Sequence, residues 1–157
     1  MKTKDHVVFM REALREAEKA FEKDEVPVGA VIVYRGKIIG RGHNRNITRN
    51  DPTAHAEIVA IKEASKHLKS ARLSDTTIYV TIEPCAMCAG ALVWARVKHL
   101  VYGARDEKSG ACGSVINVTD NIGLNHRLKL TSGVMEQECR EVIQSFFQRK
   151  RKKHKRK

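Results

Sequence analysis

Residues 76–96 read TTIYVTIEPCAMCAGALVWAR, and this stretch changes character once, at its proline. Thr76–Ile82 is rich in β-branched and aromatic residues and predicts a strand. Pro84 cannot continue that strand, and Cys85–Arg96 then predicts a helix. We therefore expect a strand followed directly by a helix, with a Cys-x-x-Cys motif in the first turn of the helix.

The residues before this stretch predict a helix and a hairpin. Apolar side chains recur every three or four positions near the N-terminus, which is typical of an amphipathic helix over Lys4–Lys23. Two stretches rich in β-branched residues follow, Val28–Tyr34 and Lys37–Gly42, with Arg35-Gly36 between them as a two-residue turn. We expect these two stretches to pair as an antiparallel hairpin.

A second helix is expected after the hairpin. The polar run Arg45–Thr53 predicts a loop, and Thr53 is the candidate N-cap of a helix over Ala54–Leu68. The C-terminal half adds a strand, an irregular region, a brief strand and a last amphipathic helix, over Lys98–Gly103, Ala104–Asn125, Leu128–Leu130 and Met135–Arg149. Strands separated by helices at this spacing predict an α/β domain with helices on a central sheet, and 157 residues fit a single domain.

The charge of the chain is unevenly distributed. Lys and Arg number 30 against 18 Asp and Glu, which gives a net charge of +12 and favours an anionic partner such as nucleic acid. Eight of these cations lie in Arg149–Lys157, where no acidic residue occurs. We therefore divide the chain into a domain over residues 1–149 and a basic C-terminal tail over residues 150–157. By itself, the tail is expected to be a solvated and frayed terminus.

The sequence favours a cytoplasmic protein with no membrane segment. The apolar cluster Val7–Met10 is interrupted by Arg11 and Glu12, so it forms neither a signal-peptide core nor a membrane span. In a reducing compartment, a Cys-x-x-Cys motif is more often a metal or redox site than a disulfide. Cys112 and Cys139 are expected to be small buried thiols without a chemical role.

Candidate metal ligands occur at the starts of two predicted helices. Cys85 and Cys88 are three residues apart, so they share a helical face, and the helix dipole favours their thiolate forms. His55 supplies a third ligand. Two thiolates and a neutral imidazole balance the charge of Zn²⁺ and leave the fourth tetrahedral position to water, which is typical of catalytic zinc. Sulfur ligands argue against magnesium and calcium.

Glu57 is the residue that separates catalysis from simple metal binding. It follows His55 by two positions and faces a different way on the helix, so it is a candidate for proton transfer and not for metal binding. Taken singly, Cys-x-x-Cys fits a redox pair or a structural zinc site, and His-x-Glu fits a surface pair. Together, with a proline before the first cysteine, they match the His-x-Glu and Pro-Cys-x-x-Cys signature of zinc deaminases.

The sequence resembles the bacterial tRNA-specific adenosine deaminases, a branch of the cytidine-deaminase-like superfamily. The resemblance extends over the whole chain to about Arg149. It rests on seven short segments, which are Glu25–Ala30, His43-Asn44, Pro52–Glu57, Tyr79–Ala91, Val101–Asp106, Asn125–Arg127 and Phe146-Phe147. The cysteine motif would fit any member of the superfamily, whereas the longer segments around it are more specific.

This resemblance implies a three-layer α-β-α domain with a central mixed sheet and a homodimer with one zinc ion per subunit. It implies hydrolytic conversion of the wobble adenosine in a tRNA anticodon stem-loop to inosine. Matching the motifs assigns zinc binding to His55, Cys85 and Cys88 and the proton shuttle to Glu57. It assigns substrate contacts to Asn44, Val28, Ala54 and Asp106.

Two other functions stay open at this point. One is another deaminase of the superfamily that acts on free guanine, cytosine or a nucleotide, and the other is a zinc-stabilised RNA-binding module without catalysis. Trp94 departs from the family pattern and is expected near the dimer or RNA surface. Phe146 and Phe147 either stack on RNA bases or pack against the sheet. A flexible basic tail would add phosphate contacts that do not depend on base sequence.

Overall fold

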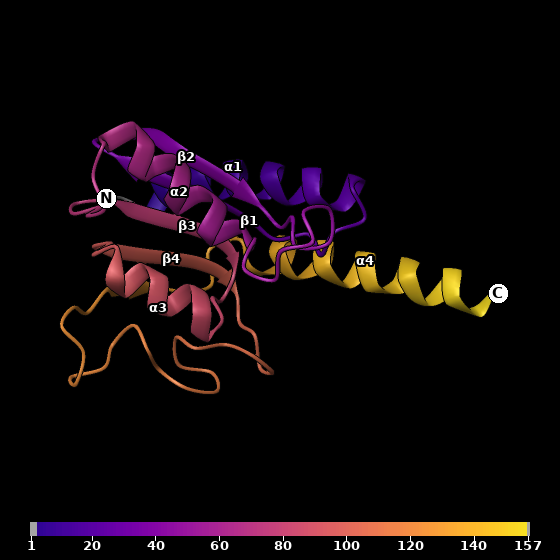
Figure 1. Cartoon of the computed structure of the whole chain (residues 1–157). Coiled ribbons are helices and arrows are strands. Elements are labelled where there is room, and N and C mark those ends of the chain that lie inside the picture. Colours follow the sequence, from indigo (N-terminus) through magenta and orange to yellow (C-terminus); the bar gives the residue numbers. More distant parts are fainter. Residues whose placement is uncertain (1–2, 157) are drawn as a thin grey trace.

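A five-stranded sheet runs through the middle of the computed structural model, which describes residues 3–156 (Figure 1). In chain order the strands are β1 (Gly29–Tyr34), β2 (Lys37–His43), β3 (Thr77–Ile82), β4 (His99–Ala104) and β5 (Lys129–Thr131). The helices are α1 (Thr3–Glu22), α2 (Ala56–Leu68), α3 (Ala86–Trp94) and α4 (Glu136–Lys155). Each predicted helix and strand is found within two residues of its predicted bounds, except at the C-terminal end of α4. No helix within the described residues is long and apolar enough to cross a membrane.

The strand order is β2-β1-β3-β4-β5, and the sheet is mixed. β1 runs antiparallel to both β2 and β3, so its first residue, Gly29, pairs with His43 at the end of β2. β3 and β4 are parallel, and Ile82 pairs with Ala104 where both strands end. The start of β1 and the ends of β2, β3 and β4 therefore meet at one edge of the sheet.

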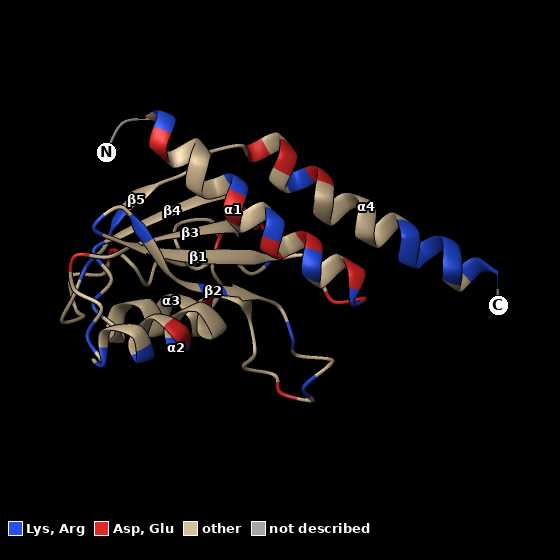
Figure 2. Cartoon of the chain, turned by 90° about the horizontal axis from the view of Figure 1, so that it is seen from above, with Lys and Arg blue, Asp and Glu red and all other residues tan. Residues whose placement is uncertain are grey.

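Helices cover both faces of the sheet and produce three layers (Figure 2). α1 and α4 pack together on one face, and α2 and α3 pack together on the other. Each face has its own cluster of buried apolar side chains, the larger one lying under α2 and α3. This arrangement confirms the predicted α-β-α architecture with a central mixed sheet.

α2 lies unusually close to β2 because small residues meet at their contact. Ala56, Ala60 and Ala64 of α2 are fully buried. A Cβ atom added to Gly42 of β2 would overlap the backbone carbonyl of Ala56, and one added to Gly40 would overlap that of Ala60. Because no side chain separates the two backbones, the first turn of α2 is held at the end of β2.

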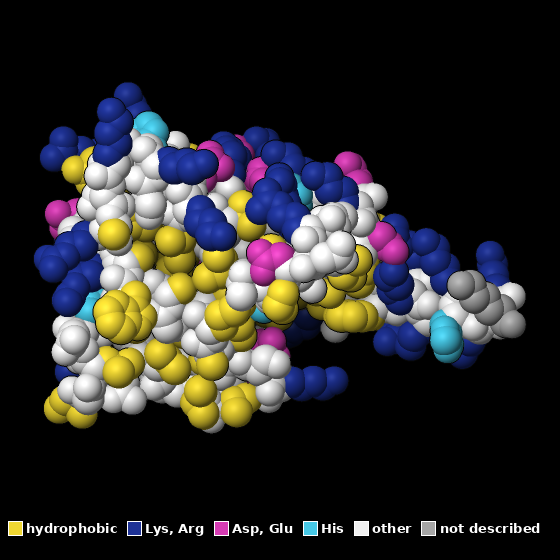
Figure 3. Space-filling model, viewed as in Figure 1, with side chains coloured by type: hydrophobic (Ala, Val, Ile, Leu, Met, Phe, Trp, Pro, Cys, Tyr) yellow, Lys and Arg dark blue, Asp and Glu magenta, His cyan; other side chains and the backbone are white. Residues whose placement is uncertain are grey.

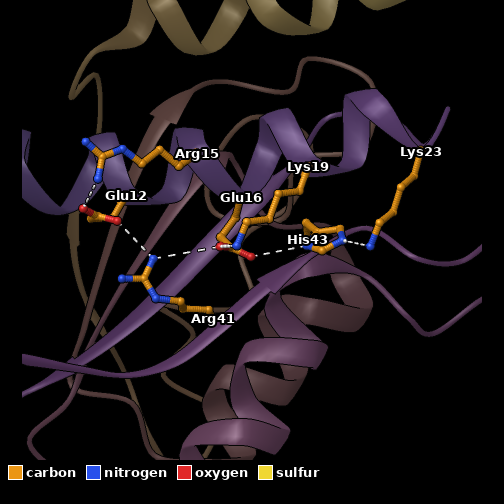
Figure 4. A network of polar contacts seen from close by, with 7 residues as sticks. All are labelled: Glu12, Arg15, Glu16, Lys19, Lys23, Arg41 and His43. Atoms are coloured by element: carbon orange, nitrogen blue, oxygen red, sulfur yellow. Dashed lines mark hydrogen bonds and ion pairs between the residues drawn. The ribbon is translucent and has the colours of Figure 1, made fainter.

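A polar network joins α1 to β2 on the other face of the sheet (Figure 4). Oε1 of buried Glu16 lies 3.3 Å from Nδ1 of His43, and its Oε2 accepts a hydrogen bond from Lys19 at 2.6 Å. Glu12, one turn earlier, accepts a hydrogen bond from Arg41 at 3.0 Å. Burial opposes the ionisation of Glu16, but hydrogen bonds with His43 and Lys19 outweigh it and lower the pKa of this carboxyl to about 2.

The predicted cap of α2 is wrong. Thr53 does not cap the helix, because its hydroxyl donates to Oδ1 of Asp51 at 2.6 Å within the preceding loop. The N-cap position belongs to His55, and its side chain makes no capping hydrogen bond. Oδ1 of Asn44 instead accepts the backbone N–H of Ala56 at 2.9 Å. A residue twelve positions earlier in the chain therefore supplies the acceptor that a local cap would supply.

The prediction that the chain frays after Arg149 is also wrong, because α4 continues to Lys155 and projects beyond the sheet (Figure 2). Lys and Arg are good helix formers, and α4 contains neither glycine nor proline. Asp24 after α1 accepts hydrogen bonds from Arg149 at 3.2 Å and from Lys150. The predicted division at residue 149 therefore falls inside a helix, and Lys157 lies outside the described residues.

Cys112 and Cys139 are both buried, as predicted, and neither forms a disulfide. Burial raises the pKa of each thiol to about 12. Both thiols therefore stay protonated and unreactive at neutral pH.

Candidate metal centre and substrate pocket

The sheet edge where four strand ends meet carries the candidate site residues. Val28 precedes β1, Asn44 follows β2, Cys85 follows β3 and Asp106 follows β4. The first turn of α2 begins at the same edge and adds His55. Strand direction brings four of these segments together, and the close packing of α2 on β2 adds the fifth.

His55, Cys85 and Cys88 form a compact group of potential ligand atoms. Nδ1 of His55 lies 3.7 Å from Sγ of Cys85 and 3.5 Å from Sγ of Cys88, and the three atoms lie within 4.8 Å of one another. A tetrahedral ion with bonds of about 2.3 Å to sulfur and about 2.0 Å to nitrogen holds such ligands about 3.6 Å apart. The group therefore fits a metal ion bound by two thiolates and one imidazole.

Two members of this group occupy helix N-caps. His55 is the N-cap of α2 and Cys85 is the N-cap of α3, and neither side chain caps its own helix with a hydrogen bond. The free N–H groups and the dipole at each helix start favour negative charge nearby. Hydrogen bonds with Cys88 and His55 lower the pKa of Cys85 to about 3. Cys85 is therefore a thiolate at neutral pH, the form that binds metals.

Glu57 lies in the first turn of α2 and lines the same pocket as His55. Its side chain is only 3% exposed. Burial raises the pKa of its carboxyl, so that it holds a proton more readily than an exposed glutamate does. Among the described residues, Glu57 is outside the group of three potential ligands, although its carboxyl hydrogen-bonds with Cys88, so it is a candidate for proton transfer beside the metal site.

A cleft of ≈ 450 Å³ opens beside these residues. This volume is typical of pockets that take a small ligand or a single base. Val28, Asn44 and Asp106 line the cleft together with Glu57. Ala54, the fourth predicted contact, is not among the lining residues; it is buried, and its backbone carbonyl accepts the N–H of Arg45 at 2.9 Å.

Parts of the pocket wall were not predicted from the sequence. Asn46 lies in the loop after β2, and Lys108 and Ser109 follow Asp106 in the loop after β4. Their only sequence signal is that they are neighbours of predicted contacts in polar loops. Ile143 of α4 also lines the pocket, although it lies in the amphipathic pattern of a helix and carries no signal of its own.

The two phenylalanines of α4 have different environments. Phe146 is buried, and its ring packs edge-on against Phe21 of α1 with a centroid distance of 5.8 Å. Phe147 is 43% exposed and lines the pocket. Phe146 is therefore packed, as one of the two interpretations from the sequence expects, but against α1, while exposed Phe147 is available to a ligand.

A mixed sheet between two helix layers, with His-x-Glu at the start of one helix and Pro-Cys-x-x-Cys at the start of another, defines a nucleobase deaminase with the cytidine-deaminase-like fold. Residues 4–151 match the family of MafB19-like deaminases. Over nearly its whole length, the chain is also similar to individual proteins whose substrate is known more precisely than that of the MafB19-like family.

The tRNA-specific adenosine deaminases of Haemophilus influenzae and Bacillus subtilis are each 48% identical to this chain over 148 residues, which are 94% of this chain and 86% and 92% of those proteins. The tRNA-specific adenosine deaminase of Streptococcus pyogenes serotype M18 is 45% identical over 151 residues, covering 96% of this chain and 95% of that protein. The chain belongs to the family of tRNA-specific adenosine deaminases, which confirms the resemblance seen in its sequence.

Solved structures agree with this placement. One from a study of A-to-I editing by tRNA:A34 deaminases is 46% identical, with a TM-score of 0.83 over 85% of this chain and 97% of that one. The guanine deaminase of Bacillus subtilis is 44% identical, with a TM-score of 0.60 over 62% of this chain and 63% of that one. The fold is therefore shared by deaminases of different substrates, and the site residues have to explain which base is chosen.

Proposed function

We propose that this chain hydrolyses the exocyclic amine of the wobble adenosine in a tRNA anticodon and so converts that adenosine to inosine. The tRNA-specific adenosine deaminases related to it support this substrate. The observation that carries the proposal is the grouping of His55, Cys85 and Cys88 with Glu57 beside a cleft of nucleobase size. Because tRNA is the substrate, we assign the protein to the cytoplasm.

Zinc is the metal in this proposal, with one ion per subunit. His55, Cys85 and Cys88 would hold it, because sulfur ligands disfavour magnesium and calcium. Three protein ligands leave one position of a tetrahedron open, as in catalytic zinc sites. When bound there, zinc lowers the pKa of a water molecule to about 7 and makes it a nucleophile at neutral pH.

Glu57 moves the protons of the reaction. Its carboxylate takes a proton from the attacking water and gives it to the ring nitrogen next to C6 of adenine. The remaining proton of that water then passes through Glu57 to the exocyclic amine, the C6–N bond breaks to release ammonia, and the oxygen stays on C6 as the carbonyl of inosine. The raised pKa of Glu57 suits it to hold a proton between these two transfers.

The pocket wall contacts the nucleotide in this proposal. Val28 packs on the face of the base, and the amide N–H groups of Asn44 donate to an acceptor on its edge. Asp106 contacts the sugar, and exposed Phe147 stacks beside the base. Ala54 is buried next to His55 and does not line the cleft, so we assign it no direct contact with the nucleotide. An anticodon loop suits this pocket because its unpaired bases can be turned out of the stack at low cost.

Residues 150–157 are proposed as a phosphate-binding extension of the deaminase domain 1–149. α4 lines the pocket with Ile143 and Phe147, and its later turns carry the exposed cations away from the pocket. With a rise of 1.5 Å per residue, Lys155 lies about 12 Å beyond Phe147 along the helix. At this distance, the cations would meet the backbone of the anticodon stem and contact phosphates regardless of base sequence.

A homodimer is also proposed. Trp94 at the end of α3 is 85% exposed, and it borders a shallow groove with Ile61 and Ala91 between α2 and α3. Hydrophobic side chains gather on this face of the molecule, as Figure 3 shows. An exposed apolar surface with an aromatic residue at its centre is typical of a protein interface, and a second copy of the chain would cover it. Light scattering of the intact protein and of Trp94→Glu tests this: we expect a dimer and a monomer, respectively.

The experiment that tests the function is inosine formation in anticodon stem-loop RNA. The zinc-loaded protein is expected to convert the wobble adenosine and to leave free adenine, guanine and cytosine unchanged. Turnover of a free base without turnover of the RNA would instead support a free-base deaminase. The similarity of the chain to the guanine deaminase of Bacillus subtilis is the reason to test this alternative. RNA binding that is unaffected by Glu57→Ala, with no inosine from either protein, would support a non-catalytic module.

A further inference from the structure

Glu83 is a buried carboxylate that the reaction described above does not use. It is the residue before Pro84, immediately ahead of the metal-binding turn, and it is 1% exposed. Its two oxygens accept four hydrogen bonds, two on each. The donors are the N–H groups of Asp106 at 3.3 Å, Cys112 at 3.0 Å and Ser114 at 3.1 Å, and the hydroxyl of Ser114.

All four donors belong to one segment, residues 105–114 after β4, and this segment forms a wall of the pocket. Asp106, Lys108 and Ser109 line the cleft. The segment wraps closely around the carboxylate, because a Cβ added to Gly110 would overlap the carboxyl group of Glu83. The carboxyl group of Glu83 therefore fills the space beneath this loop, a position where an apolar side chain is more usual.

A buried carboxylate is stable only where donors replace its lost hydration. Within residues 3–156, no lysine, arginine or histidine forms an ion pair with Glu83, so N–H and O–H donors of the loop compensate its charge. A packing role would be served as well by an uncharged side chain. The charge is instead used to draw the N–H groups of the loop inward, and this fixes where Asp106 lies relative to Cys85.

A second buried glutamate holds the opposite wall in the same way. Glu25 is fully buried, and it accepts hydrogen bonds from the N–H groups of Ile47 at 3.1 Å and Thr48 at 2.8 Å and from the hydroxyl of Thr48 at 2.8 Å. These donors belong to the loop after β2, which carries Asn46 into the pocket. The two loops that border the substrate are therefore each anchored by one buried carboxylate.

We propose that Glu83 is a positioning residue for the substrate, which holds the loop 105–114 against the end of β3 so that Asp106 meets the nucleotide at a fixed distance from the metal centre. The identity of the nucleotide rests on the proposed function, whereas the anchoring of the loop does not. Glu83 also lines the cleft, but both of its oxygens accept hydrogen bonds from the loop, so we assign it a positioning role and not a catalytic one. Its loss should therefore weaken substrate binding more than it slows the chemical step.

Glu83→Gln tests this role because the glutamine amide presents donors where the loop also presents donors. We expect KM for stem-loop RNA to rise about 10-fold or more, with kcat changed by less than about threefold and one zinc ion per chain retained. A merely structural role would reduce the fraction of folded enzyme, so that apparent kcat falls while KM stays constant. That result would overturn the proposal.

Hydrogen exchange of the zinc-loaded protein without RNA gives a second, independent measurement. Glu83→Gln should speed exchange of the amides of residues 105–114 and leave residues 45–50 unchanged, while Glu25→Gln should do the reverse. Equal exchange in wild type and Glu83→Gln would overturn the proposal even if the chain acts on another substrate. Ser114→Ala removes one of the four donors, so it should raise KM by a smaller factor, and it keeps the test available if Glu83→Gln fails to fold.

Discussion

Oδ1 of Asn44 accepts the backbone N–H of Ala56 at 2.9 Å, and this hydrogen bond joins the end of β2 to the first turn of α2. The side-chain amide of Asn44 therefore has a structural role at the helix start and a proposed role in binding the base. Its oxygen satisfies an orphan donor at the start of the helix that carries His55 and Glu57, and Asn44 also lines the cleft, where we propose that its amide nitrogen meets the base. The same side chain therefore helps to hold the first turn of α2 and forms part of the cleft beside it.

Substitutions of Asn44 should separate these two purposes. Asn44→Ala removes both the acceptor and the N–H donors, so we expect a loss of about 1 kcal/mol of stability together with weaker RNA binding. Asn44→Asp keeps an acceptor for Ala56 and loses the donors, so stability should be retained while KM rises. Urea unfolding and steady-state kinetics measure the two effects. Equal losses of stability in both variants would contradict the capping role.

Glu57→Gln should abolish turnover without affecting metal binding. The amide cannot accept and return a proton, so kcat should fall by a factor of about 10³ or more. Zinc content should stay at one ion per chain, because Glu57 is outside the ligand group. Glu63→Gln, an exposed glutamate on the same helix, is the matched control and should keep wild-type kcat. Loss of zinc from Glu57→Gln would instead make Glu57 a ligand.

The buried pair Glu16–His43 should stabilise the fold more than its exposed neighbours do. Glu16→Gln leaves His43 without its charged partner inside the protein, so we expect a loss of about 2–3 kcal/mol. Glu12→Gln affects only the more exposed ion pairs with Arg15 and Arg41 and should cost less than about 1 kcal/mol. The pKa of Glu16 lies below its unfolded value, so its contribution is present above about pH 4.5 and is lost as the pH falls to about 2. Urea unfolding at pH 7 and pH 3 tests both statements.

His99 should make the protein less stable in mild acid. Burial and the nearby charge of Lys129 lower the pKa of His99 to about 4, and His6 and Lys98 add to this effect. Because the folded pKa is below the unfolded value of about 6.5, the unfolded chain binds the proton first as the pH falls. Stability is therefore full above about pH 6.5 and is lost progressively towards pH 4.

His99→Gln provides the control, since glutamine cannot titrate and can still hydrogen-bond to Thr131. Between pH 7 and pH 5, wild type should lose about 1–2 kcal/mol more of its free energy of unfolding than the variant loses. Metal release in acid affects both proteins equally. The same loss in both would show that His99 does not titrate in this range.

The sequence predicted what depends on local pattern and missed what depends on distant contacts. His55 and the cysteines could be proposed as ligands because each lies at a helix start, a position that local sequence signals predict, and the structure groups them within 4.8 Å. The cap of α2 could not be predicted, because its acceptor, Asn44, lies just after β2, twelve positions before Ala56 in the chain. The role of Glu83 likewise depends on Ser114, thirty-one positions later in the chain. The length of α4 was also missed, because the high helix propensity of Lys and Arg outweighs the repulsion between their like charges, from which a frayed terminus was predicted.

The basic turns of α4 should set the salt dependence of RNA binding. Each phosphate contact made by Lys or Arg contributes about 0.7–0.9 to the slope of log K against log salt. Changing Lys152, Lys153 and Lys155 to Gln together should lower that slope by up to about 2–3 and weaken binding to all stem-loops alike. These positions leave the anchor between Lys150 and Asp24 intact, so α4 should keep its direction.

A matched triple variant shows whether the salt dependence of RNA binding comes from the position of these cations or from the total charge of the protein. Lys37, Arg72 and Lys98 are exposed cations outside the pocket wall and outside α4. Changing them to Gln removes the same charge, but they have no phosphate to contact, so the slope should change by less than about 1. Binding measured between 50 and 200 mM salt separates the two variants. A local phosphate contact depends on where the cation lies as well as on its charge. Equal slopes for the two triple variants would therefore mean that the α4 cations act only through the net charge of the protein.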